Sequence, residues 1–145
     1  MIRQLIQDHY DGFAKLGHEM GGYKAVLEKG RTFKRAAPSR NIPAQYTKQK
    51  QCFYNAAHVV MLNRDLTYVE GFYCRTTTPI PMPHAWTVNA AGSIVDPTAD
   101  VCDHAYMGIL VPDVWQWLAT SEYYGLFDCT SFIESLGFPP CQWRT

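Results

Sequence analysis

Hydrophobic residues recur at the spacing of an α-helix in two stretches of the chain. In the first stretch a helix is predicted from Ile2 to about Leu16, with Gly21-Gly22 expected to end it, and a shorter helical piece follows from Tyr23 to about Lys29. The second stretch has apolar residues at i, i+3, i+4 and i+7 and predicts a helix from Cys52 to about Asn63. Cys52 is therefore expected in the first turn of a helix, at the positive end of the helix dipole.

Between and after these helices the pattern indicates loops and strands. Residues 30–51 contain a glycine and two prolines among polar and basic residues, which predicts a long loop. Residues 66–73 are rich in strand-forming residues and predict a strand. Three prolines are then expected to interrupt regular structure before a second strand begins at His84: Pro79, Pro81 and Pro83. His84 to Val88 and Ser93 to Asp96 flank the segment 89–92, which favours a hairpin.

The C-terminal part of the chain is aromatic and acidic, and its pattern favours helices. A helix is predicted from Pro112 to about Ser121, and a short last helix is predicted after Ser131, which forms a capping-box pattern with Glu134, with Gly137 closing it. The order of helices, strands and helices predicts an α+β fold with a small antiparallel sheet. We expect one domain over residues 1–145, with its core at about 45–100 and a C-terminal helical extension at 101–145.

Composition excludes several classes of protein. The chain has 145 residues, of which 47% are hydrophobic and 18% charged, and this balance is typical of a folded domain and not of a disordered chain. The formal net charge is zero, which gives no reason to expect nucleic-acid binding, and no apolar run is long enough to cross a membrane. Five cysteines, an odd number without regular spacing, favour a reducing compartment, so we expect a cytoplasmic protein.

The even charge balance conceals an asymmetry along the chain. Between Lys24 and Lys50 there are eight basic residues and a single acid, Glu28, whereas from Gln51 onward three basic residues face nine acids. The two parts can simply attract each other in the fold or lie solvated. Alternatively, the basic segment forms a rim that attracts an acidic substrate.

Three residues in chain order suggest nucleophilic catalysis: Cys52 opening a helix, His84 starting a strand and Asp96 ending the next strand. A helix N-terminus favours a thiolate, an imidazole can take and return a proton, and a carboxylate can orient that imidazole. His84 and Asp96 face each other directly if the hairpin centres on Ala90, as a three-residue 89–91 loop would require. An even loop would send them to opposite faces unless a bulge at Gly92 shifts the register.

These residues belong to a longer series of short motifs that resembles the transglutaminase-like core of the papain-like cysteine-enzyme superfamily. The resemblance covers about one third of the chain and is carried by Gln51-Cys52-Phe53, Ala56, Tyr68-Val69-Glu70-Gly71-Phe72, His84-Ala85-Trp86, Gly92 and Val95-Asp96-Pro97-Thr98. It implies a papain/transglutaminase-like fold in which the helix that begins at the nucleophile packs on a small antiparallel sheet. It also implies that Cys52 is the nucleophile, His84 the general base and acid, and Asp96 the orienting carboxylate.

Four further residues are candidates for contacts with the substrate. The oxyanion hole would use the backbone N–H of Cys52 and one more donor, for which Gln45 and Gln51 are candidates. Asn55, three residues after Cys52, would line the pocket or face solvent. Trp86 shares a strand face with His84 and would wall the site or belong to the core. No cofactor is required, and the Cys102-x-His104 pair has no spacing that favours a metal site.

The sequence leaves three functions open. The leading prediction is a cysteine hydrolase of peptidase, amidase or deamidase type that forms a thioester on Cys52 with a protein, peptide or small amide substrate. The first alternative is an acyl transferase with the same triad, either a transglutaminase or an N-acyltransferase. The second is a non-enzymatic binding protein that uses the basic segment to hold an acidic partner. The sequence does not indicate an oligomeric state.

Overall fold

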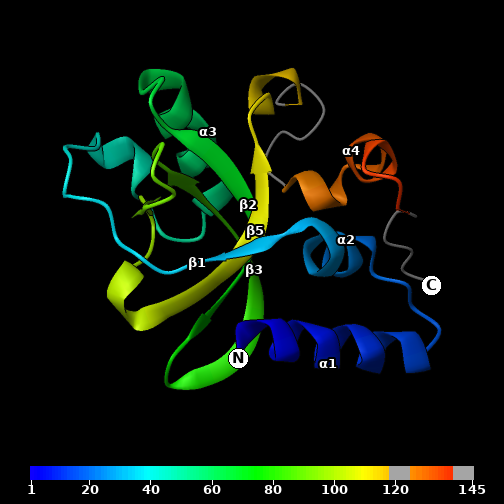
Figure 1. The fold of residues 1–145 in the computed structure, drawn as a ribbon. Coiled ribbons are helices and arrows are strands. Elements are labelled where there is room, and N and C mark those ends of the chain that lie inside the picture. Colours follow the sequence, from blue (N-terminus) through cyan, green and yellow to red (C-terminus); the bar gives the residue numbers. More distant parts are fainter. Residues whose placement is uncertain (118–124, 139–145) are drawn as a thin grey trace.

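The computed structural model describes residues 1–117 and 125–138 and shows an α+β protein (Figure 1). Over these residues, four α-helices and five β-strands are accompanied by short 3-10 helices, the first of which is η1, Ala44–Tyr46. The helices are α1 Ile2–Lys15, α2 Gly21–Lys29, α3 Cys52–Leu62 and α4 Thr130–Ser135. The strands are β1 Arg31–Phe33, β2 Thr67–Arg75, β3 Thr78–Val88, β4 Ile94–Val95 and β5 His104–Val111.

The strands form one curled antiparallel sheet in the order β1-β5-β2-β3-β4. Its two edges meet, because Ala36, just after β1, bridges Ile94 of β4 in parallel. Two backbone hydrogen bonds hold this contact, from the Ala37 N–H to the Ile94 carbonyl at 2.9 Å and from the Ile94 N–H to the Arg35 carbonyl at 2.7 Å. The sheet therefore has an inner and an outer face.

Each face of the sheet is buried in its own hydrophobic cluster, because successive strand residues point to opposite sides. The outer face packs against the helices and contributes Tyr68, Phe72, Cys74, Ala85, Met107 and Ile109 to the larger cluster. The inner face forms a second cluster of Phe33, Val69, Trp86, Val88, Ile94 and Tyr106. A strand buried on both faces has no simple alternation of apolar and polar residues, so the strands of this sheet are hard to recognise from sequence.

The predicted helices at residues 2–16, 23–29 and 52–63 are confirmed within a few residues, but the role expected for Gly21-Gly22 is wrong. Helix α1 ends at Lys15, and Gly17 follows with φ of 81°. Gly21 and Gly22 instead open α2. A Cβ atom on Gly22 would lie 3.0 Å from the ring of Phe127, so the missing side chain lets α2 approach the C-terminal segment.

The expected interruption at the three prolines is also wrong, since β3 runs through Pro79, Pro81 and Pro83. Prolines at alternate positions lack N–H groups along one edge of a strand only. Strand β3 pairs with β2 along most of its length, whereas β4 reaches only Thr87 and Val88 on the other side. The prolines therefore occupy a part of β3 where the β4 side has no partner strand.

Two strands were not predicted at all. Strand β1 lies within the expected loop 30–51, and β5 lies within the expected helical extension 101–145. Strand β5 is central, because it pairs with both β1 and β2. Gly71 and Gly108 face each other across β2 and β5, where a Cβ atom on Gly108 would lie 2.7 Å from the Glu70 carbonyl and 2.8 Å from the Trp86 ring. This close approach requires glycine.

The C-terminal predictions are partly outside the described residues. The helix expected from Pro112 to about Ser121 is, over its described part, a single 3-10 turn at Val114–Gln116. The last helix begins at Thr130, two residues before the expected start after Ser131, and Cys129 at its N-cap makes no side-chain capping bond. The expected Ser131–Glu134 capping box is therefore not formed, whereas Gly137 does follow the helix with φ of 87°.

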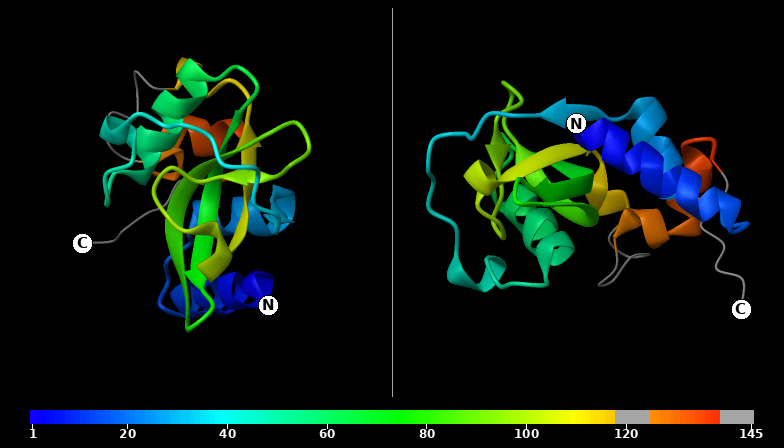
Figure 2. Two further views of the ribbon diagram at one scale, coloured as in Figure 1. Left: turned by 90° about the vertical axis from the view of Figure 1, so that its left-hand side faces the viewer. Right: turned by 90° about the horizontal axis from the view of Figure 1, so that it is seen from below.

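The remaining segments place α3 beside the sheet. Figure 2 shows the chain between β1 and α3 running around the outside of the molecule before it reaches η1 and α3. Helix α3 packs mainly on β3 and also on β2. Within the described part of the chain, no helix combines the length and apolar character needed to span a membrane.

Candidate active site

Cys52 is the first residue of α3, as predicted, and its side chain is partly exposed. Gln51 is the N-cap but makes no side-chain capping bond. Lys50 adopts φ of 65°, the left-handed region that a lysine rarely occupies, so the chain turns sharply just before the helix. The first turn of a helix leaves backbone N–H groups without helical partners, and these can stabilise negative charge beside Cys52.

His84 and Asp96 lie on the same side of the sheet, although not in the expected register. Thr87 pairs with Val95 and Val88 with Ile94, so the loop has five residues, 89–93, instead of three. The Asn89 side chain closes this loop by accepting hydrogen bonds from the N–H groups of Ala91 and Ser93. Continuing the register places Asp96 diagonal to His84, and the two side chains meet with Nε2 and Oδ2 2.7 Å apart.

The Asp96 carboxylate is fully buried and accepts hydrogen bonds from four donors. Oδ1 accepts from the N–H groups of Thr98 and Ala99, which follow it in the chain. Oδ2 accepts from His84 and from the Tyr106 hydroxyl at 2.7 Å. Although burial raises the pKa of Asp96, the hydrogen bonds and charge of His84 and the bond from Tyr106 lower it below its ordinary value. Asp96 is therefore held as a fixed carboxylate.

The environment of His84 keeps its imidazole protonated. Burial lowers the pKa of His84, but hydrogen bonding to Asp96 and Cys52, together with the charges of both groups, raises it from 6.5 to about 9. Because Nε2 is bound to Asp96, Nδ1 is the nitrogen left to face the thiol. Tyr73 covers the imidazole, with the two rings stacked 3.8 Å apart at 12°. The three predicted triad residues are thus brought together.

Asn55 joins the helix that carries Cys52 to the loop that carries Asp96. Its side-chain amide donates to the Lys48 carbonyl at 2.8 Å and to the Thr98 hydroxyl at 2.9 Å. The sequence analysis expected Asn55 to line the pocket or to face solvent, but the residue is fully buried and does neither. Its Oδ1 atom has no hydrogen-bond partner among the described residues. Asn55 therefore links α3 to the loop after β4 through its hydrogen bond to Thr98.

Gln45 and Gln51, the candidate oxyanion donors, line one cavity of about 460 Å³ together with Phe53. Gln45 belongs to η1, and both glutamines are exposed. Gln51 and Phe53 are the sequence neighbours of Cys52, so this cavity opens at the first turn of α3, although Cys52 itself does not line it. Trp86 differs, because it is fully buried in the inner cluster, with its ring centroid 5.9 Å from that of His84. It supports the imidazole and does not line an open site.

Two residues of the site were missed by the sequence analysis, Tyr106 and Tyr73. Tyr106 lies on β5, the strand that was not recognised, so nothing placed it near Asp96. Tyr73 lies on β2, where Gly71 pairs with His84, so it points to the same face as the histidine two residues along the strand. If the sequence analysis had aligned β2 with β3 so that Gly71 faced His84, the alternation of side chains along β2 would have placed Tyr73 beside the histidine.

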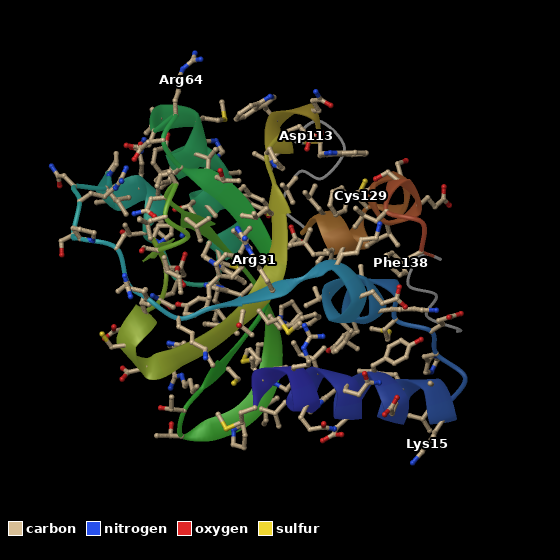
Figure 3. The ribbon with its side chains drawn as sticks, in the orientation of Figure 1. Lys15, Arg31, Arg64, Asp113, Cys129 and Phe138 are labelled. Carbon is tan, nitrogen blue, oxygen red and sulfur yellow. The ribbon has the colours of Figure 1, made fainter. Side chains whose placement is uncertain are left out.

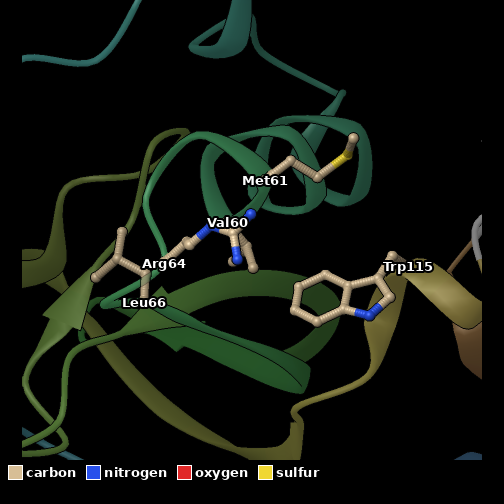
Figure 4. Close-up of a pocket in the computed structure, with 5 residues that line it drawn as sticks. All are labelled: Val60, Met61, Arg64, Leu66 and Trp115. Atoms are coloured by element: carbon tan, nitrogen blue, oxygen red, sulfur yellow. The ribbon is translucent and has the colours of Figure 1, made fainter.

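A second large cavity lies far from the triad. A groove of about 540 Å³ is lined by Val60, Met61, Arg64, Leu66 and Trp115, and the Trp115 ring points across it toward Val60 and Arg64 (Figure 4). It lies at the C-terminal end of α3, whereas Cys52 begins that helix. Over residues 1–117 and 125–138, no three histidine, cysteine or acidic side chains are grouped as a metal site would need.

Comparison with known proteins returned no match: no family model, no curated protein and no solved structure matches the chain. The geometry of the site is therefore the basis for assigning a function.

Proposed function

We propose that the protein is a cysteine hydrolase of transglutaminase-like fold that cleaves an amide or related acyl bond through a thioester on Cys52. The observation that supports this most strongly is the buried His84–Asp96 pair, 2.7 Å apart, whose histidine also hydrogen-bonds Cys52, the first residue of α3. A carboxylate, an imidazole and a thiol in this order provide an orienter, a proton carrier and a nucleophile. The papain-like core is part of the same proposal.

The chemistry follows from the protonation of His84. The Cys52 thiolate attacks the carbonyl carbon of the substrate, and a new S–C bond forms as the carbonyl oxygen takes up negative charge beside the N-terminus of α3. The C–N bond then breaks, and the imidazolium gives its proton to the departing amine. Water then attacks the thioester carbon as His84 takes its proton, a C–O bond forms and the C–S bond breaks, which releases a carboxylic acid and restores the Cys52 thiolate and the imidazolium. Asp96 orients the imidazole throughout.

Thiol alkylation tests the coupling between Cys52 and His84. At pH 6 we expect iodoacetamide to alkylate Cys52 at least about tenfold faster than the exposed Cys102, since an uncoupled thiol has a pKa near 8.5 and is almost fully protonated. In a His84→Gln variant the advantage should disappear. Mass spectrometry of the two peptides gives both rates from one sample, and circular dichroism checks that the variant is folded. An equally slow Cys52 in the folded wild type would overturn the proposal.

The acceptor is tested separately. An acetyl ester should acylate Cys52 in the wild type, and the acyl group should pass to water. If instead the acyl group accumulates on Cys52 until an amine is added, the protein is an acyl transferase with the same triad. A Cys52→Ser variant that keeps the full biological effect would identify a binding protein.

A further inference from the structure

We propose that the cavity beside Cys52 binds a carboxylate of the substrate, so that the enzyme acts on amides with an anionic group next to the scissile bond. This rests on the function proposed above. The cavity, which we call the lysine pocket, is lined by Gln45, Lys48, Lys50, Gln51, Phe53 and Tyr54.

The lysine pocket has positive charge and none of the opposite sign. Two of its six lining residues are lysines and none is acidic. Neither ammonium group is in an ion pair within residues 1–117 and 125–138, whereas Lys24 pairs with Glu19 and Arg40 with Asp65. At Lys48 and Lys50, the basic segment 24–50 is therefore not neutralised by acidic residues from later in the chain. Two unpaired ammonium groups on the wall of one cavity attract an anion.

Local structure fixes the backbone positions of Lys48 and Lys50. The Lys48 carbonyl accepts a hydrogen bond from the buried Asn55 amide, which ties this residue to α3. Lys50 lies in the left-handed turn directly before Gln51, with φ of 65°. Because Cα atoms of consecutive residues are about 3.8 Å apart, the lining residues Gln51 and Phe53 each begin one residue's length from Cys52, so an anion in this cavity lies close to the first turn of α3.

A different cavity, lined in part by Gln49, has no such preference. It has a volume of about 410 Å³ and reaches Tyr73, the ring that covers His84. One cation, Arg75, and two acids, Asp100 and Asp103, contribute to its lining. The two acids there outnumber the arginine, and His104 is the other titratable residue of that lining, whereas the lysine pocket carries charge of one sign. An anionic substrate group is therefore placed on the side of Gln51 and Lys50.

Two alkylating reagents of nearly equal size test this charge preference directly. Iodoacetate carries a carboxylate and iodoacetamide does not, and with both the thiolate sulfur forms a bond to carbon as iodide leaves. The measurement is the ratio of the two second-order rates at Cys52, read by mass spectrometry of its peptide. The charge on His84 influences this ratio equally in every variant that retains the histidine. A change in the ratio when the lysines are removed therefore reports the effect of the lysine pocket alone.

The test variant is Lys48→Gln combined with Lys50→Asn, because asparagine tolerates the left-handed backbone at residue 50. Its control is Lys15→Gln combined with Lys34→Gln, which removes the same charge outside the pocket. Lys15 projects from the end of α1 (Figure 3), and Lys34 is exposed. We expect the iodoacetate-to-iodoacetamide ratio to fall about threefold to tenfold in the test variant, as unit charges several ångströms away in water would produce, and to stay near the wild-type value in the control.

The outcomes separate this inference from the function on which it rests. An unchanged ratio in the test variant, or an equal fall in the control, overturns the lysine pocket while leaving the triad intact. A Cys52 that reacts no faster than Cys102 with either reagent overturns the proposed function together with the pocket. In the wild type, added salt should also reduce the ratio, because exposed charges are screened within about 10 Å at 0.1 M ionic strength.

Discussion

Asp96 accepts two of its four hydrogen bonds from backbone N–H groups of its own loop and a third from His84 on the neighbouring strand β3. The fourth comes from Tyr106 on β5, which is separated from β3 by β2 in the sheet. Tyr106 is 1% exposed, and its pKa is raised far above the ordinary value by burial and by Asp96. Its hydroxyl therefore stays protonated at neutral pH and donates to the carboxylate. Tyr106 acts as a positioning residue through Asp96.

A Tyr106→Phe variant should lose both stability and reactivity. Hydrogen bonds to charged groups contribute about 1.5–3 kcal/mol, so we expect the free energy of unfolding to fall by about that amount. Alkylation of Cys52 at pH 6 should slow several-fold, because His84 is less firmly oriented. Urea denaturation and the alkylation assay measure the two effects, with Tyr10→Phe on α1 as the control. Normal alkylation at reduced stability would show that Tyr106 is only structural.

At the scale of elements, the site depends on how α3 is attached to the loop after β4. Cys52, the proposed nucleophile, belongs to the helix, and His84 and Asp96, its proposed partners, belong to the β3–β4 hairpin and the residue after it. The Asn55 amide bridges the two through Thr98, and Gln49 adds a bond from its side-chain amide to the Thr98 carbonyl at 2.8 Å. These contacts fix the first turn of α3 against the carboxylate that follows β4.

A double-mutant cycle measures this attachment. Asn55→Ala removes two hydrogen bonds of a buried side chain and leaves the Lys48 carbonyl without that donor, so we expect a loss of about 2–3 kcal/mol in unfolding free energy. Thr98→Val removes the shared bond alone. The coupling energy between the two sites should be about 1 kcal/mol. A coupling near zero would show that the helix and the loop are held together by other contacts.

At the scale of the whole molecule, the buried His84 should make stability depend on pH. The folded pKa of about 9 lies above the ordinary 6.5, so the contribution of His84 is fully present below pH 6.5 and is lost as pH rises through 9. The pKa of Asp96 is shifted the other way, below 3.8, so its contribution is present above that pH and is lost under strong acid. The protein should therefore be most stable in between, on the acid side of neutrality.

The size of the alkaline effect follows from the shift of His84. A difference of 2.5 pKa units corresponds to about 3 kcal/mol, so the unfolding free energy of the wild type relative to His84→Gln should fall by an amount of that order between pH 6 and pH 9.5. Urea denaturation of both proteins at several pH values provides the comparison. A difference that stays constant over this range would mean that the imidazole titrates at its ordinary pKa.

The amino-acid sequence by itself determined the elements whose residues interact over short distances along the chain. The helical spacing of apolar residues defined α1 and α3, and therefore placed Cys52 at the start of a helix. The hairpin motif placed His84 and Asp96 on neighbouring strands, and the five-residue loop seen in the structure put them on one face of the sheet. Such signals are local, because helix periodicity and tight turns are encoded within a few residues.

Only the tertiary structure decided which distant segments complete the sheet and the site. Strand β5 is a central strand because β1 and β2 lie on either side of it, and strand β1 has only three residues and exists because β5 pairs with it. The three prolines fit within β3 because β4 is too short to reach them. Tyr106 reaches Asp96, and Lys48 and Lys50 share one cavity with the neighbours of Cys52, only once the curled sheet and α3 are assembled. Pairing between residues far apart in the chain depends on the packing of the whole fold, which no short stretch of sequence encodes.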